Sequence, residues 1–181
     1  NDTLVYGIRA WKHNGNLHKG IEGFFQEREP VRLTLRTIGT FGGVHAEREK
    51  IYLFENPAVF SVFVKKYPDC AAICGNGQPR LATLLLLDFL KENHSFYYHG
   101  DFDPEGLLIA QRLKERYGES ICLWNYRADW YERYLSDVNL RMKKVEKVYL
   151  PELLEVKMQM QKRKRAAYQE AMLDMLEPEK K

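Results

Sequence analysis

The chain has 181 residues, of which 45% are hydrophobic and 29% are charged, and its formal net charge at pH 7 is +3. This length suits one compact domain with an extension, and the apolar content is ample for a core. The most apolar stretch, residues 81–90, is too short to cross a bilayer and contains Asp88, so we expect no membrane partner. The small positive charge does not by itself indicate a nucleic-acid partner.

Residues 1–48 have a mixed pattern, with strand-like runs at residues 4–8 and 31–36 and a polar stretch between them. This pattern predicts the end of a preceding domain or a linker region. The chain also starts at Asn1 without Met. We therefore expect it to be a fragment of a longer protein.

Residues 49–126 alternate between strand-like and helical patterns, which predicts an α/β domain. Strands are expected over residues 50–54, 70–74, 95–99 and 120–124, and helices over about 57–67, 79–93 and 104–117. Right-handed crossovers fold this order into a four-stranded parallel sheet with helices on both faces. With the Rossmann-like strand order 2-1-3-4, a ligand site is expected outside the carboxyl ends of strands one and three.

An acidic motif, Asp101-Phe102-Asp103-Pro104-Glu105-Gly106, follows the third of these strands. Alternate residues near a strand end project the same way, so Asp101 and Asp103 are expected to converge. Carboxylates this close repel one another unless a cation neutralises them. The alternative is a solvated acidic turn in which an Asp caps the following helix.

Glu55 ends the first expected strand, and the topology brings it face to face with Asp101. This combination predicts a site for Mg²⁺ or Mn²⁺, because hard carboxylate oxygens bind these ions. We assign Asp101 and Asp103 as metal ligands, and Glu55 as a ligand or as the general acid/base. Glu105 is a candidate ligand for a second ion, or else a first-turn residue favoured by the helix dipole.

Two further groups of polar residues are candidates for contact with DNA. Asn76 and Gln78 lie in the turn after the second strand, at the same edge as the acids, although turn formation alone explains the Asn-Gly pair. Residues 127–181 are expected to form a helical C-terminal extension. It carries an uninterrupted basic run, Lys162, Arg163, Lys164 and Arg165, which is either a solvated helix face or a DNA contact.

The three cysteines, Cys70, Cys74 and Cys122, fall in apolar runs and have no Cys/His pair at zinc-ligand spacing. We expect them to be reduced core residues of a cytoplasmic protein. His99 lies two residues before Asp101, and we expect it to be structural rather than catalytic.

Several motifs together resemble the Toprim (topoisomerase–primase) domain of the JetD family, the nuclease subunit of Wadjet anti-plasmid systems. A generic Toprim domain shares only the Glu and the Asp-x-Asp, whereas this resemblance covers roughly residues 30–177. It is carried by Leu33-Thr34-Leu35-Arg36, Glu55-Asn56-Pro57-Ala58-Val59-Phe60, Cys74-Gly75-Asn76-Gly77-Gln78-Pro79, Tyr98-His99-Gly100-Asp101-Phe102-Asp103-Pro104-Glu105-Gly106 and Tyr168-Gln169-Glu170.

The resemblance implies a Toprim-type sheet and a metal-dependent endonuclease that cleaves closed circular DNA in plasmid defence, recruited by an SMC-type motor complex. The family is similar to the A subunit of topoisomerase VI and to Spo11. A strand-breaking subunit with a nucleophilic Tyr is therefore one alternative function. A non-catalytic module for DNA binding or for dimerisation, as in a homodimer, is the other, although the intact acids argue against it.

Overall fold

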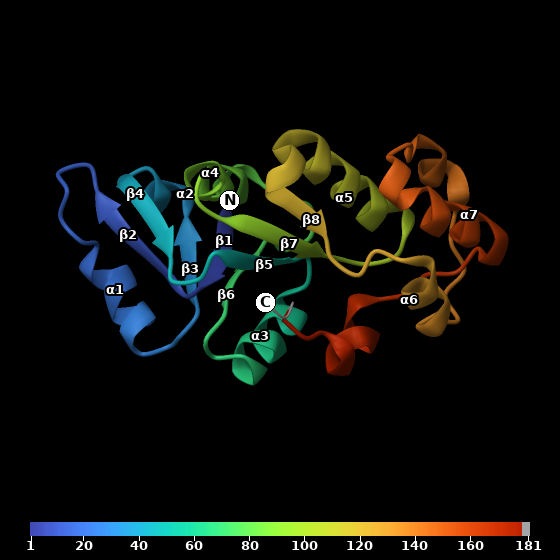
Figure 1. Cartoon of the computed structure of the whole chain (residues 1–181), viewed down its shortest axis with the longest axis horizontal. Coiled ribbons are helices and arrows are strands. Elements are labelled where there is room, and N and C mark those ends of the chain that lie inside the picture. The colour runs from blue at the N-terminus through green and yellow to red at the C-terminus, as the bar shows by residue number, and fades with distance from the viewer. Residues whose placement is uncertain (179–181) are drawn as a thin grey trace.

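A six-stranded mixed sheet runs through the computed structural model, which describes residues 1–178 (Figure 1). Its strands are β1 (Asp2–Tyr6), β3 (Val31–Thr34), β5 (Lys50–Phe54), β6 (Ala71–Cys74), β7 (Ser95–His99) and β8 (Ile121–Leu123), in the order β3-β1-β6-β5-β7-β8. The pairs β6–β5, β5–β7 and β7–β8 are parallel, whereas β1 is antiparallel to both β6 and β3. The carboxyl ends of β5 and β7 therefore lie side by side.

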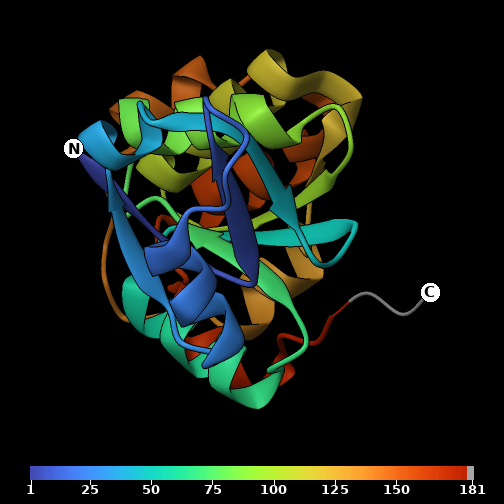
Figure 2. The same ribbon diagram turned by 90° about the vertical axis from the view of Figure 1, so that its left-hand side faces the viewer.

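Helices cover both faces of this sheet. In Figure 1, α4 (Leu81–Leu90) and α5 (Pro104–Tyr117) lie above it and α3 (Pro57–Lys66) lies below, and Figure 2 shows the same layers from one end. Along β5, Leu53 belongs to the core shared with α4 and α5, while Phe54 packs in the core shared with α3. Successive strand residues point to opposite faces, so a strand covered on both sides is apolar throughout.

The sheet corrects the expectation of four parallel strands, because residues 1–48 add two more and make it mixed. Leu4 of β1 lies opposite Cys74 of β6, and the Thr3 hydroxyl donates to the Cys74 carbonyl at 3.1 Å. Strand β3 continues the sheet beyond β1. An antiparallel neighbour needs no fixed crossover connection, so the local pattern predicted strand-like runs here without revealing their partners.

A second, two-stranded sheet pairs β2 (Ile8–Lys12) with β4 (Phe41–Ala46), next to α1 (Lys19–Gln26) and α2 (Leu35–Ile38) at the left of Figure 1. Gly7 makes the turn from β1 into β2 with a φ of +70°. An alanine Cβ at this position would lie 2.6 Å from the Cys70 carbonyl oxygen. Both the backbone conformation and the space therefore require glycine.

The C-terminal part consists of short helices joined by extended segments. They are η1 (Gly118–Ser120), α6 (Ala128–Arg133), η2 (Met142–Lys147), η3 (Pro151–Leu153), α7 (Leu154–Arg163) and η4 (Gln169–Met175). Within the expected helical C-terminal extension, α7 ends at Arg163, where Lys164 takes a left-handed conformation with φ 56° and ψ 34°. No helix within residues 1–178 is both long enough and apolar enough to span a membrane.

Candidate active site

Two carboxylates meet where β5 and β7 end. The strand register pairs Phe54 with His99, so Glu55 and Gly100 come next on neighbouring strands. The backbone N–H of Asp101 donates to Glu55 Oε2 at 3.3 Å across a sequence separation of 46 positions. The structure thus brings together Glu55 and Asp101, as the parallel topology predicts.

Both of these carboxyl groups ionise less readily than usual. Burial, followed by the charge of Asp101, raises the pKa of Glu55 to about 7. Burial also raises the pKa of Asp101 to about 6, with smaller contributions from the charges of Glu170 and Asp103 and an opposing one from a Gln169 N–H bond. Clustered carboxylates with raised pKa values are what a bound cation would neutralise.

Asp103 holds the start of α5. Its Oδ1 accepts hydrogen bonds from the backbone N–H groups of Glu105 at 2.9 Å and Gly106 at 2.7 Å, which is the geometry of a helix N-cap. The alternative considered for the acidic motif is therefore present at Asp103. An alanine Cβ at Gly106 would lie only 2.0 Å from the Asp101 carbonyl oxygen, so glycine is needed for α5 to begin this close to the acidic loop.

Glu105 lies apart from the pairing of Glu55 with Asp101. It occupies the first turn of α5, and its carboxylate forms an ion pair with Lys144 of η2. A helix turns about 100° per residue, so alternate residues no longer share a direction once α5 has begun. In this arrangement Glu105 is a partner of Lys144, and a second ion bound by it stays a prediction.

The donor set fits Mg²⁺ or Mn²⁺ in its chemistry. Within residues 1–178, no three His, Cys, Asp or Glu side chains are already gathered as a metal-binding group. However, Mg²⁺ is often held by one or two carboxylates together with substrate phosphates and water, rather than by a full protein cage. The hydrogen bonds described use one oxygen each of Glu55, Asp101 and Asp103. The second oxygen of each carboxylate remains for a cation.

A segment that the sequence did not assign to the site closes it from the C-terminal side. We call residues 166–170 the C-terminal strap. Phe102 and Ala167 form an antiparallel bridge, and the backbone N–H of Gln169 donates to Asp101 Oδ1 at 2.8 Å. The fully buried Gln169 side chain donates to the His99 carbonyl at 2.7 Å and accepts from the Asn56 N–H at 3.2 Å. Gln169 therefore joins the ends of both strands.

Glu170 adds a further carboxylate to the same edge. Its Oε1 accepts a hydrogen bond from Asn56 Nδ2, and its charge contributes to the raised pKa of Asp101. The sequence offered one signal, the resemblance of Tyr168-Gln169-Glu170 to the JetD family, but that resemblance implied no role for Glu170. The structure indicates that Glu170 lies near the ligands assigned from sequence.

His99 is fully buried and cannot reach a substrate. Its Nδ1 bonds the Trp124 carbonyl at 3.0 Å, and burial lowers the pKa of its imidazole to about 4. Its ring contacts the rings of Phe102, Trp124 and Tyr126. The expected structural role of His99 agrees with this environment.

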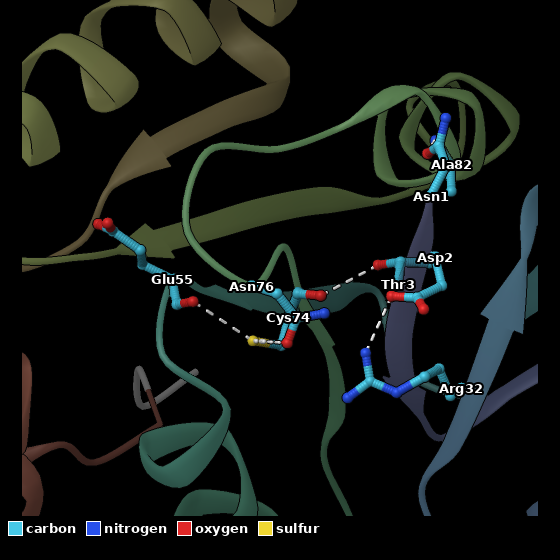
Figure 3. Close-up of polar contacts among 8 residues, drawn as sticks. All are labelled: Asn1, Asp2, Thr3, Arg32, Glu55, Cys74, Asn76 and Ala82. Carbon is cyan, nitrogen blue, oxygen red and sulfur yellow. Dashed lines mark hydrogen bonds and ion pairs between the residues drawn. The ribbon is translucent and has the colours of Figure 1, made fainter.

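Asn76 lies near the backbone of Glu55, not near its carboxylate. Asn76 has a positive φ of 53°, and the turn is closed by a bond from the Gly77 N–H to the Glu55 carbonyl at 2.9 Å. Figure 3 shows the Glu55 side chain leading away from Cys74 and Asn76. Gln78 lines a small hollow between α4 and α5. These positions give Asn76 a role in the turn, and DNA contact by either residue stays a prediction.

The basic run adjoins the acidic loop through the strap. Within the described residues, ion pairs join Arg163 to Glu132 and Arg165 to Asp137, whereas Lys162 and Lys164 have no such pair. An Asn139–Arg165 bridge places residues 139–144 beside the run. In the part of the chain that the structure describes, four exposed cations of these two segments lack a carboxylate partner, and we name them the basic strip: Arg141, Lys143, Lys162 and Lys164.

Comparison with known proteins gives one family. A family model described as "Protein of unknown function C-terminus (DUF2399)" matches residues 31–179. This range runs from β3 through every candidate site residue named above. No curated protein matches the chain.

Proposed function

The chain belongs to the DUF2399 family, whose model describes the C-terminal part of a protein of unknown function, and from its acidic site we propose that the chain is a metal-dependent DNA endonuclease domain. One observation carries the proposal. Glu55 and Asp101, from the ends of adjacent parallel strands, meet in a partly buried site where both pKa values are raised. Such a site suits a divalent cation and, through it, a phosphodiester substrate.

We propose further that this is the Toprim domain of a JetD-type nuclease subunit in a Wadjet plasmid-defence system, with an SMC-type motor complex as its partner. The parallel part of the sheet, in the order β6-β5-β7-β8, supports this interpretation because its switch point lies where Glu55 and Asp101 meet. The resemblance of the motifs to that family supports the choice of substrate, closed circular DNA.

The acidic residues would have different roles in hydrolysis. A bound Mg²⁺ or Mn²⁺ ion would neutralise charge at the scissile phosphate and lower the pKa of an attacking water. Asp101 and Asp103 would hold the ion with the oxygens left over from their bonds to Gln169 and to the α5 backbone. Glu55, with a pKa of about 7, would hold the ion or exchange a proton near neutral pH.

Metal-dependent cleavage is the direct test of this function. The full-length protein, with its partner complex, is expected to linearise closed circular plasmid in Mg²⁺ or Mn²⁺ and to lose this activity in EDTA. Calorimetric titration of the chain with Mn²⁺ is expected to show binding that Glu55→Gln weakens. Cleavage that persists in EDTA would contradict the proposal.

The basic strip predicts how DNA is held. Replacing Lys162 and Lys164 by Gln is expected to weaken duplex binding evenly across sequences and to lower the salt slope by about one for each phosphate that is no longer neutralised. Replacing Arg163 and Arg165 is expected to do less, because Glu132 and Asp137 already neutralise their charges.

Fluorescence anisotropy over a range of KCl concentrations measures both effects. The double variant Lys12→Gln, Lys19→Gln removes the same charge at the opposite end of the molecule, around β2 and α1, and serves as the control. If the strip and control variants weakened DNA binding equally, the basic strip would contribute only general positive charge and would not be a specific DNA-binding surface.

A further inference from the structure

Two buried tyrosine hydroxyls lie beside Glu55, and the proposed chemistry does not yet use them. Tyr98, in β7, is 1% exposed, and Tyr126, after β8, is 5% exposed. Their rings are stacked with centroids 5.9 Å apart and planes 11° from parallel. The Tyr98 hydroxyl donates to Glu55 Oε2 at 3.4 Å. The Tyr126 hydroxyl, by contrast, makes no hydrogen bond of good geometry among the described residues, although it interacts with the neighbouring Tyr98 hydroxyl.

Gly100 shows how close these groups are. A Cβ built on Gly100 would lie 2.5 Å from the Tyr98 hydroxyl oxygen, 2.7 Å from Glu55 Oε2 and 2.9 Å from the Tyr126 hydroxyl oxygen. All three oxygens therefore surround one point against the Gly100 backbone. A side chain at residue 100 would collide with these three oxygens, which explains why the residue before Asp101 is glycine.

The buried hydroxyl of Tyr126, which makes no hydrogen bond of good geometry, needs an explanation. A buried polar group without a partner lowers stability, and phenylalanine would fill the same space without that loss. The carboxylate in this cluster, that of Glu55, accepts two hydrogen bonds that are both long, at 3.3 and 3.4 Å. Both Oε2 of this carboxylate and the Tyr126 hydroxyl lie within 3 Å of the same point, the Cβ position built on Gly100, at 2.7 and 2.9 Å.

We propose that Tyr98 and Tyr126 are positioning residues for Glu55, both donating to Oε2 of its ionised carboxylate and so fixing its orientation and leaving Oε1 for a cation. Outer donors of this kind orient ligating carboxylates at metal sites. The cation rests on the proposed function, whereas the contact between hydroxyls and carboxylate is a property of the chain alone. The two parts can therefore be tested separately.

The metal-free chain tests the contact. In Tyr126→Phe, carboxyl ¹³C NMR is expected to show Glu55 ionising at a higher pH than in the wild type, because the ionised form has lost a donor. Tyr149→Phe is the matched control, since Tyr149 is 67% exposed and bonds Glu115 on the outer surface. An unchanged Glu55 titration in Tyr126→Phe would overturn the proposal, whatever the protein does to DNA.

The metal-loaded protein tests the consequence. Tyr126→Phe is expected to weaken Mn²⁺ binding, or to lower kcat without changing KM for plasmid, by about 10- to 100-fold. A wild type that neither binds Mn²⁺ nor cleaves would remove the proposed function and leave the NMR result to decide the positioning role. A wild type that does both, together with an unaffected Tyr126→Phe, would overturn the positioning role and leave the function intact.

Discussion

Asp101→Asn is expected to lower metal-dependent DNA cleavage by the full-length protein steeply while making the metal-free chain more stable at about pH 8. Asn keeps the shape of the side chain and an oxygen that accepts from the Gln169 N–H, so the fold is retained. It loses the charge that would hold the ion and oppose the charge developing on phosphorus. Loss of such electrostatic stabilisation lowers kcat by about a hundredfold to a thousandfold.

The stability gain follows from the sign of the pKa shift. The pKa of Asp101 is about 6 in the folded chain, against 3.8 ordinarily, so the folded state favours the protonated form. Below about pH 4 the group is protonated in both states and has no effect on folding. Between about pH 4 and about pH 6 the unfolded chain loses this proton while the folded chain keeps it, so stability falls; above about pH 6 the folded state carries a partly buried charge and the loss stays constant. Asn avoids this loss of about 1–3 kcal/mol.

Plasmid cleavage and thermal melting at about pH 4 and about pH 8 measure the two effects. Asp129→Asn is the control, since Asp129 pairs with Arg127 on the surface; it should leave activity unchanged and should not make the chain more stable at about pH 8, because that pair lowers the pKa of Asp129. Cleavage retained by an Asp101→Asn, Asp103→Asn double variant would show that this edge is not the active site. A covalent protein–DNA adduct in the wild type would instead favour the topoisomerase-like alternative.

The meeting of Glu55 with Asp101 could be predicted because both follow apolar strands in a regular β-α-β order. In such an order the crossover rule limits the possible topologies, and the strand ends fix the edge at which the side chains appear. The same reasoning does not extend to Glu105, because Pro104 starts a helix and the period changes from two residues to 3.6; the structure has Glu105 in the first turn of α5, which was the alternative role. The sequence also could not predict that β1 pairs with β6, because a strand-like run does not show which strand will be its antiparallel neighbour.

The strap could not be predicted because its contacts leave little trace in the sequence. Its bond to Asp101 comes from a backbone N–H 68 positions away, and a backbone donor has no residue signature. The end of α7 is equally hidden, because the left-handed residue is Lys164 rather than the usual Gly or Asn. A polar residue such as Gln169 in a helical pattern gives no hint that it is completely buried.

Gln169→Ala is expected to destabilise the chain by about 2–4 kcal/mol and to lower its melting temperature by roughly 5–15 °C. The variant removes the donor to the His99 carbonyl and the acceptor of the Asn56 N–H, and each buried partner left unsatisfied costs about 1–3 kcal/mol. The backbone bond to Asp101 survives, but the strap that positions it is loosened. Cleavage should therefore fall even at temperatures where the variant is folded.

Two further variants make this last prediction specific. Gln161→Ala removes one exposed hydrogen bond, to Glu146, and should change stability by no more than about 0.5 kcal/mol. Gln169→Glu keeps an acceptor for Asn56 but loses the donor to His99 and adds a charge beside Asp101. It should be less stable than the wild type at about pH 8 and recover part of the difference in acid, where the added carboxyl is protonated. If Gln169→Ala melts with the wild type, this side chain does not hold the strap, and the site must be closed by backbone contacts such as the Phe102–Ala167 bridge and the Gln169 N–H bond to Asp101.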